Sequence, residues 1–168
     1  MKVYKIRVIL DTEKDVIREI AINSEHSLED LHNAITNAFG FAGDEMASFY
    51  RTDENWEQGE EFPLFDVGAG DQRKIPMGDM DIDRILINPD DKMIYLYDFL
   101  NMWLFFVELI DADFQYNNIE LPNLLFSLGT VPSAAPDIQF ETEVLGDLQN
   151  DDEHFEDLDD DFGDFSFN

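Results

Sequence analysis

The sequence predicts an α+β domain built from an N-terminal β-hairpin, one main helix packed on a mixed or antiparallel sheet, and a C-terminal hairpin. Three observations support this prediction: an alternating apolar run near the N-terminus, one amphipathic stretch with cap signals at both ends, and two further β-rich runs after residue 92. This order of elements is expected of a β-grasp or a roll-like fold.

The first hairpin is predicted at residues 4–22. Apolar residues alternate with charged ones over the first strand, as in Tyr4, Ile6, Val8 and Leu10. Such alternation indicates a half-buried strand. A turn at 11–14 leads into a second β-rich run at 16–22, so the two runs are expected to pair.

The main helix is predicted from residue 28 to residue 39. Ser27 can cap its start, with Asp30 in the capping-box position. The apolar side chains recur at helical spacing, as Leu28, Leu31, Ile35, Ala38 and Phe39. Gly40 follows and can end the helix in the left-handed conformation.

The segment after the helix is expected to form a short strand at 46–51 and a loop-rich stretch at 53–74. Residues 80–87 fit a short helix and an extended link equally well, and the two alternatives stay open. Asn88-Pro89-Asp90-Asp91 predicts a turn.

The second hairpin is predicted at residues 93–99 and 103–110. The later strand is apolar on both faces, with Leu104, Phe106 and Ile110 on the side opposite Trp103 and Phe105. Such a strand is expected to be covered on both sides, by its own chain or by another. The apolar segment 121–136 is the intramolecular cover that the sequence offers, which makes residues 1–136 one domain.

Residues 137–168 form a separate acidic segment. They hold thirteen Asp or Glu and no Lys or Arg, so the segment is predicted to be a mostly disordered tail. Aromatic side chains alternate with these acids, among them Phe155, Phe162 and Phe165. This pattern suits docking into a basic apolar groove, and it suits a solubilising tail equally well.

The overall charge limits the classes of partner. A formal net charge of −29 repels phosphate groups, so direct binding to nucleic acid or to an anionic membrane is disfavoured. A basic protein is a permitted partner, and so is a role as a mimic of nucleic acid. The chain has no cysteine, no signal-peptide pattern and no apolar run long enough to span a bilayer, so the expected location is cytoplasmic. The oligomeric state is not readable from the sequence.

Residues 3–110 resemble the plasmid pRiA4b open-reading-frame-three-like family. The resemblance is carried by Tyr95-Leu96-Tyr97-Asp98-Phe99 followed by Asn101 and Trp103, where the family usually has Tyr-Asp-Phe-Gly-Asp-x-Trp. Arg18 and the isoleucines after it are similar to the family's Trp-Arg-x-Ile-x-Val strand, with Ile17 in place of the tryptophan. The resemblance implies an α+β fold and carries no definite function.

The chain departs from the family's pattern at polar positions. Leu104-Phe105-Phe106 stand where the family has Glu-His-Glu after the tryptophan, and Glu45 stands where a histidine is frequent. A working acid–base or metal site would need such ionisable groups. These replacements therefore favour a binding role over catalysis.

No catalytic residue, metal ligand or cofactor is predicted. The chain has only three histidines, and His32 is expected to be a satisfied histidine at the surface or boundary of the helix. The residues singled out for a structural or functional role are Arg18, Tyr97, Asp98, Asn101 and Trp103. Asp98 is expected to order the hairpin by accepting backbone N–H bonds, and Arg18 is hypothesised to pair with it.

The favoured interpretation is a noncatalytic protein-interaction or accessory module. Its partner would bind near Leu104, Phe106 and Ile110, or on the aromatic residues of the acidic tail. The alternatives are a nucleic-acid mimic that binds a basic protein and an enzyme that is lapsed or relies on carboxylates alone.

Overall fold

The computed structural model describes residues 1–66, 68, 73–118 and 120–135. The chain divides into two units, Met1–Ala135 and Pro136–Asn168, and all of the described residues belong to the first. Within the described residues, no helix has both the length and the apolar character needed to cross a membrane.

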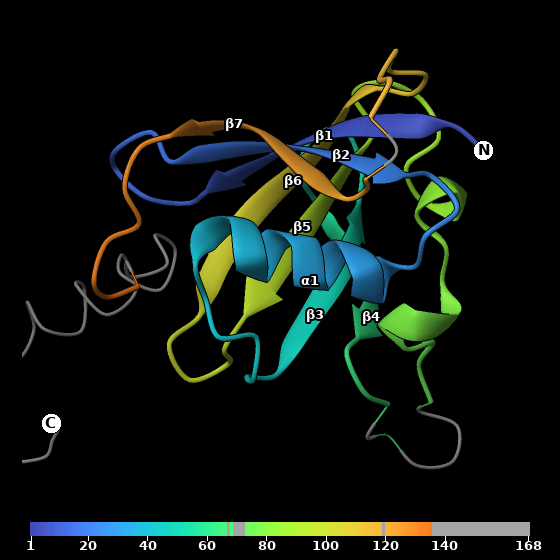
Figure 1. The fold of residues 1–168 in the computed structure, drawn as a ribbon. Coiled ribbons are helices and arrows are strands. Elements are labelled where there is room, and N and C mark those ends of the chain that lie inside the picture. The colour runs from blue at the N-terminus through green and yellow to red at the C-terminus, as the bar shows by residue number, and fades with distance from the viewer. Residues whose placement is uncertain (67, 69–72, 119, 136–168) are drawn as a thin grey trace, which may run out of the picture. The chain divides into compact units, whose positions relative to one another are not determined.

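The first unit contains a seven-stranded antiparallel sheet and one α-helix (Figure 1). The elements follow in the order β1 (Val3–Leu10), β2 (Ile17–Asn23), α1 (Leu28–Phe39), β3 (Ala47–Thr52), β4 (Gln58–Pro63), the 3₁₀ turns η2 (Met77–Asp79) and η3 (Ile82–Arg84), β5 (Lys92–Tyr97), β6 (Trp103–Asp111) and β7 (Asn123–Leu128). The strands lie in the order β4-β3-β5-β6-β1-β2-β7. The α+β class and both predicted hairpins, β1–β2 and β5–β6, are confirmed.

Helix α1 begins and ends as the sequence predicts. The Ser27 hydroxyl accepts the Asp30 backbone N–H, and the Asp30 carboxylate accepts the Ser27 N–H, so the capping box is complete. Gly40 ends the helix with a φ of 82°, in the left-handed region that glycine adopts without strain. The helix crosses one face of the sheet, where its apolar side packs on the core side chains of the strands (Figure 1).

One segment differs from the prediction, and the structure decides between the alternatives that were open for another. The loop-rich stretch contains β4, an edge strand that pairs with β3, so that Phe49 lies opposite Phe62 in the core. Residues 80–87, for which a short helix and an extended link both stayed open, contain the short 3₁₀ helix η3 (Ile82–Arg84), and further backbone bonds join this stretch to Ser24 and His26.

The expected role of the 121–136 segment is wrong. Residues 123–128 form β7, which is hydrogen-bonded to β2 at the edge of the sheet. β1 and β2 separate this strand from β6, so the segment extends the sheet instead of covering the outer face of β6. The physical reason is that an apolar strand can satisfy its backbone groups at a free sheet edge, which a covering loop cannot do.

Candidate interaction surface

The face of the sheet opposite α1 carries a row of apolar side chains. Cross-strand pairing aligns Ile17 with Ile9, Ile9 with Phe106, and Phe106 with Ile94. Opposed residues of antiparallel strands project from the same face, so these four side chains form one continuous band, called here the outer row. Ile9, Ile17 and Phe106 are half-buried and Ile94 is buried.

A charged row runs beside the outer row. Its residues are likewise aligned across the strands, in the order Glu19, Arg7, Glu108 and Lys92. Arg7 binds Glu19 at 2.8 Å, and Lys92 lies 3.7 Å from Glu108. The signs of charge alternate along this face, whereas a nucleic-acid mimic needs one sign in register.

The three partner residues predicted in β6 lie on this face or at its end. Leu104 is aligned with Leu96 of β5, and Phe106 belongs to the outer row. Ile110 lies in the irregular stretch where the register of β1 against β6 shifts. All three predicted side chains are half-buried, in contrast to Trp103, Phe105, Val107 and Leu109 on the helix side, which are buried.

Trp56 is a residue of this surface that the sequence did not reveal. It lies in the β3–β4 connection with a φ of 65°, and its ring meets that of Phe106 edge-on at a centroid distance of 4.9 Å. The Lys92 ammonium lies 5.5 Å from the same Trp56 ring. No periodicity marks Trp56, because it stands in a turn between two strands.

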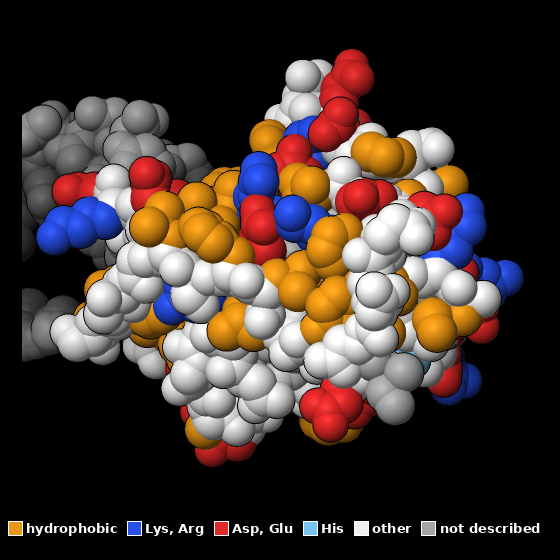
Figure 2. Space-filling model, turned by 45° about the horizontal axis from the view of Figure 1, so that its top comes forward, with side chains coloured by type: hydrophobic (Ala, Val, Ile, Leu, Met, Phe, Trp, Pro, Cys, Tyr) orange, Lys and Arg blue, Asp and Glu red, His pale blue; other side chains and the backbone are white. Residues whose placement is uncertain are grey.

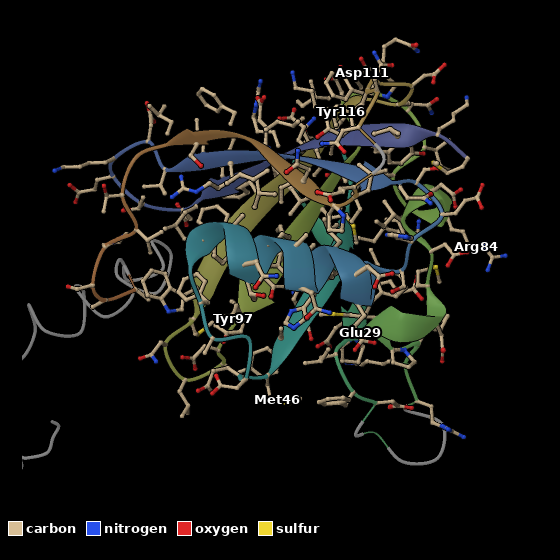
Figure 3. All side chains as sticks on the ribbon, in the orientation of Figure 1. Glu29, Met46, Arg84, Tyr97, Asp111 and Tyr116 are labelled. Atoms are coloured by element: carbon tan, nitrogen blue, oxygen red, sulfur yellow. The ribbon has the colours of Figure 1, made fainter. Side chains whose placement is uncertain are left out.

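The cluster of Tyr97, Asp98, Asn101 and Trp103 at the end of the β5–β6 hairpin is a structural turn. Asp98 has a φ of 65°, and its carboxylate accepts the backbone N–H groups of Leu100 and Asn101 and the Asn101 side-chain amide. The Tyr97 hydroxyl accepts the Gly43 N–H at 3.0 Å, and Trp103 is buried. In Figure 3, Tyr97 and Asp111 lie at opposite ends of this hairpin. Every polar contact in the cluster serves the turn or the packing of the loop after α1.

The hypothesised pair between Arg18 and Asp98 is wrong. The Arg18 guanidinium instead donates to four backbone carbonyls, those of Ile17, Ala38, Leu128 and Gly129, at 2.9 to 3.2 Å. β1 and β6 lie between the strand that carries Arg18 and the strand that ends before Asp98. Arg18 therefore joins the end of α1 to the end of β7.

His32 is buried, not at the surface as predicted. Only 2% of its surface is exposed, and its Nδ1 lies 2.5 Å from the hydroxyl oxygen of Tyr95. Burial lowers the pKa of His32 and raises that of Tyr95. A neutral histidine bonded to a neutral phenol forms a satisfied polar pair within the core.

A groove of about 600 Å³ lies between the β3–β4 connection and the turn before β5. Its walls include Asp53, Asp91, Arg51 and Lys92. The Asp53 carboxylate accepts the backbone N–H groups of Glu57 and Asn55, which lower its pKa. Asp91 likewise accepts two backbone N–H groups. These carboxylates hold turns together, and no group of three or more potential metal ligands occurs in the described part of the chain.

The remaining predicted contacts, Phe155, Phe162 and Phe165, lie outside the described residues.

Three comparisons relate the chain to known proteins. None of the curated proteins matches it. Its fold is similar to the crystal structure of a protein of unknown function, MM3350, from Methanosarcina mazei Go1, with a TM-score of 0.66 and 18% identity over 99% of this chain and 93% of the other. Residues 2–162 match the family described as plasmid pRiA4b ORF-3-like protein. This match is longer than the resemblance noted in the sequence, which covered residues 3–110. The chain belongs to the plasmid pRiA4b ORF-3-like family.

Proposed function

We propose that this protein is a noncatalytic interaction module whose outer row binds an apolar, cationic segment of another protein. The observation that carries the proposal is the continuous apolar band on the face of the sheet that α1 leaves open. Antiparallel sheets usually place polar side chains on a face that water covers. An apolar band on such a face is typical of a surface that a partner covers.

The charge of the domain favours a cationic partner. Residues 1–135 contain all ten basic residues and 26 of the 39 acidic ones. Several of the basic side chains are already paired with carboxylates, as in the contacts of Arg7 with Glu19 and of Lys74 with Glu61. The acidic excess attracts positive charge and speeds its encounter with the domain.

The test is a titration with two synthetic peptides of about ten residues, one alternating Leu with Lys and the other alternating Leu with Glu. Backbone amide shifts of the full chain are followed by NMR. The lysine peptide is expected to shift the amides of Ile9, Ile17 and Phe106, and the glutamate peptide is expected to leave them unchanged. Equal effects of both peptides, or shifts confined to the β3–β4 connection, would contradict the proposal.

Phe106→Lys is the decisive variant, and Phe99→Lys is its matched control. Phe99 is 42% exposed and lies in the turn before β6, away from the outer row. Placing a cation in the outer row repels the peptide and removes apolar contact, so Phe106→Lys is expected to weaken binding by about tenfold or more. Phe99→Lys is expected to leave the Kd unchanged. Equal affinities in the two variants would refute the assignment to the outer row.

A further inference from the structure

We infer that β7 is a self-association edge, through which two copies of this chain join their sheets. The edge is unusual in composition. The β7 sequence Asn-Leu-Leu-Phe-Ser-Leu contains no charged residue, and Leu124, Phe126 and Leu128 are each 45% exposed. A sheet edge with free backbone groups and apolar side chains is a template for pairing with another strand.

The opposite edge of the same sheet is β4, and its sequence protects it from pairing with a strand of another molecule. β4 has the sequence Gln-Gly-Glu-Glu-Phe-Pro, in which Glu60 and Glu61 place charge on the edge and Pro63 lacks a backbone N–H. Charge and proline are devices by which sheets avoid edge-to-edge pairing. β7 has neither charge nor proline within its range. Its one irregularity is a shift in the pairing with β2, where Leu125 has no partner residue. Among the described residues, the β4 edge is therefore guarded against pairing, and the β7 edge is largely open.

β7 exposes apolar groups on both faces of the sheet. Leu124 is aligned with buried Ile20 on the helix side, whereas Phe126 is aligned with Glu19 on the outer side. A cavity of about 160 Å³ adjoins Leu124 and is lined also by Ala34 and Ala38 of α1. An added strand would place its own side chains beside those of β7 on both faces, and one of them could enter this cavity. In Figure 2, where the β7 side comes toward the viewer, exposed hydrophobic side chains surround paired basic and acidic ones.

A second copy fits this edge better than its total charge suggests. The carboxylate nearest to β7 in the sheet is Glu19, and it is paired with Arg7 at 2.8 Å and with Lys5 at 3.5 Å. The acidic β3–β4 hairpin belongs to the opposite edge of the sheet. An antiparallel pair of identical strands is self-complementary about a two-fold axis, so one patch supplies both halves of the interface. With the axis near Phe126, the two Phe126 side chains meet on the same face.

Sedimentation of the full chain tests the inference directly. A dimer is expected to form as the concentration rises through the micromolar range, and Phe126→Lys is expected to raise the dimer Kd at least about tenfold, because a lysine on the edge blocks pairing. Leu100→Lys is the control, since Leu100 is 92% exposed in the turn before β6. A monomer at every concentration, or a dimer that Phe126→Lys leaves intact, would overturn the inference.

Cross-linking gives a second readout that does not depend on a disruptive change. The chain has no cysteine, so a Ser127→Cys variant carries a single thiol on β7. A short bis-maleimide is expected to convert this variant to a covalent dimer and to leave Gln58→Cys, on the β4 edge, monomeric. Equal cross-linking of both variants would show association through another surface. Binding of the lysine peptide to the outer row is measured separately, so either proposal can fail without the other.

Discussion

Arg18 joins three stretches of backbone that are distant in sequence. Its guanidinium donates to carbonyls at the end of α1, in β2 and at the end of β7, and it lies 4.9 Å from the Phe39 ring. Arg18→Met keeps much of the side-chain volume and removes every donor, so four partly buried carbonyl contacts are lost. We expect the free energy of unfolding to fall by about 2–4 kcal/mol in urea titrations followed by circular dichroism.

Arg84→Met is the matched control for this variant, because Arg84 is exposed in η3 and forms no ion pair within the described residues. It should change the free energy of unfolding by less than about 0.5 kcal/mol. A similar loss in both variants would show that general charge removal, and not the carbonyl contacts, sets the stability.

His32 makes the stability depend on pH. Burial lowers its pKa in the folded state, so below pH about 6.5 the unfolded chain binds a proton that the folded chain excludes. The free energy of unfolding is therefore expected to fall as the pH drops from 7 to 5, by at most about 1.4 kcal/mol per pH unit for this one group. His32→Gln keeps a hydrogen-bonding group for Tyr95 and removes the titration.

Urea unfolding at several pH values separates His32 from the carboxylates. The variant is expected to have a flatter profile between pH 7 and 5, even if it is less stable throughout. Asp53 and Asp66 have lowered pKa values in the folded state through backbone N–H bonds, so their contribution is lost only as the pH falls below about 4. An unchanged slope in His32→Gln would contradict the assignment.

At the scale of elements, Gly129 fixes the end of β7. Gly129 and Gly40 have nearly the same positive φ, 84° and 82°, but a Cβ at Gly129 would lie 2.0 Å from the Asp15 carbonyl oxygen. A Cβ at Gly40 would meet nothing within 4 Å. Gly40→Ala is expected to cost about 1 kcal/mol for its backbone conformation alone, and Gly129→Ala about 3 kcal/mol or more. Equal losses in thermal unfolding would show that backbone strain alone governs both sites.

Local signals predicted the elements whose determinants are close in sequence. The capping box at Ser27, the stop at Gly40 and the first hairpin each depend on residues only a few positions apart. β4 escaped prediction because Gln58 to Glu61 show no apolar alternation, and the strand exists through its pairing with β3. For β7, the apolar sequence indicated that the segment packs against another element of the fold. It did not indicate that this element is the strand β2.

The outer row, the candidate interaction surface, was predicted only in part, because its residues come from several strands. The alternation within 103–110 is enough to separate Phe106 from Phe105, and the structure puts them on opposite faces. The neighbours that extend Phe106 into a row, Ile9 and Ile94, come from other strands and need the register. Arg18 was paired wrongly because its acceptors are backbone carbonyls, which a sequence does not mark.

At the scale of the whole molecule, some of the negatively charged side chains stabilise turns. Asp53, Asp91 and Asp111 each accept backbone N–H groups that close turns. Replacing all three by Asn reduces the formal net charge from −29 by three units and keeps an acceptor oxygen at each turn. This variant is expected to stay within about 1 kcal/mol of the parent in urea unfolding.

The triple Ala variant at the same positions has the same charge and lacks the acceptors. It is expected to lose about 2–4 kcal/mol, because each turn forfeits one or two hydrogen bonds. If the Asn and Ala variants are equally stable, the turns do not depend on these side chains, and the aspartates act only through their charge.

The unequal edges of the sheet also determine how far association can proceed. The proposed pairing through β7 would use the edge that carries no charge in the described part of the chain, and Glu60 and Glu61 would remain on the outer border of the joined sheets. Growth by further strand addition is then blocked at both ends. The same difference between the two edges would limit the product to a finite pair, and it would protect a chain rich in β-structure from forming open-ended fibres.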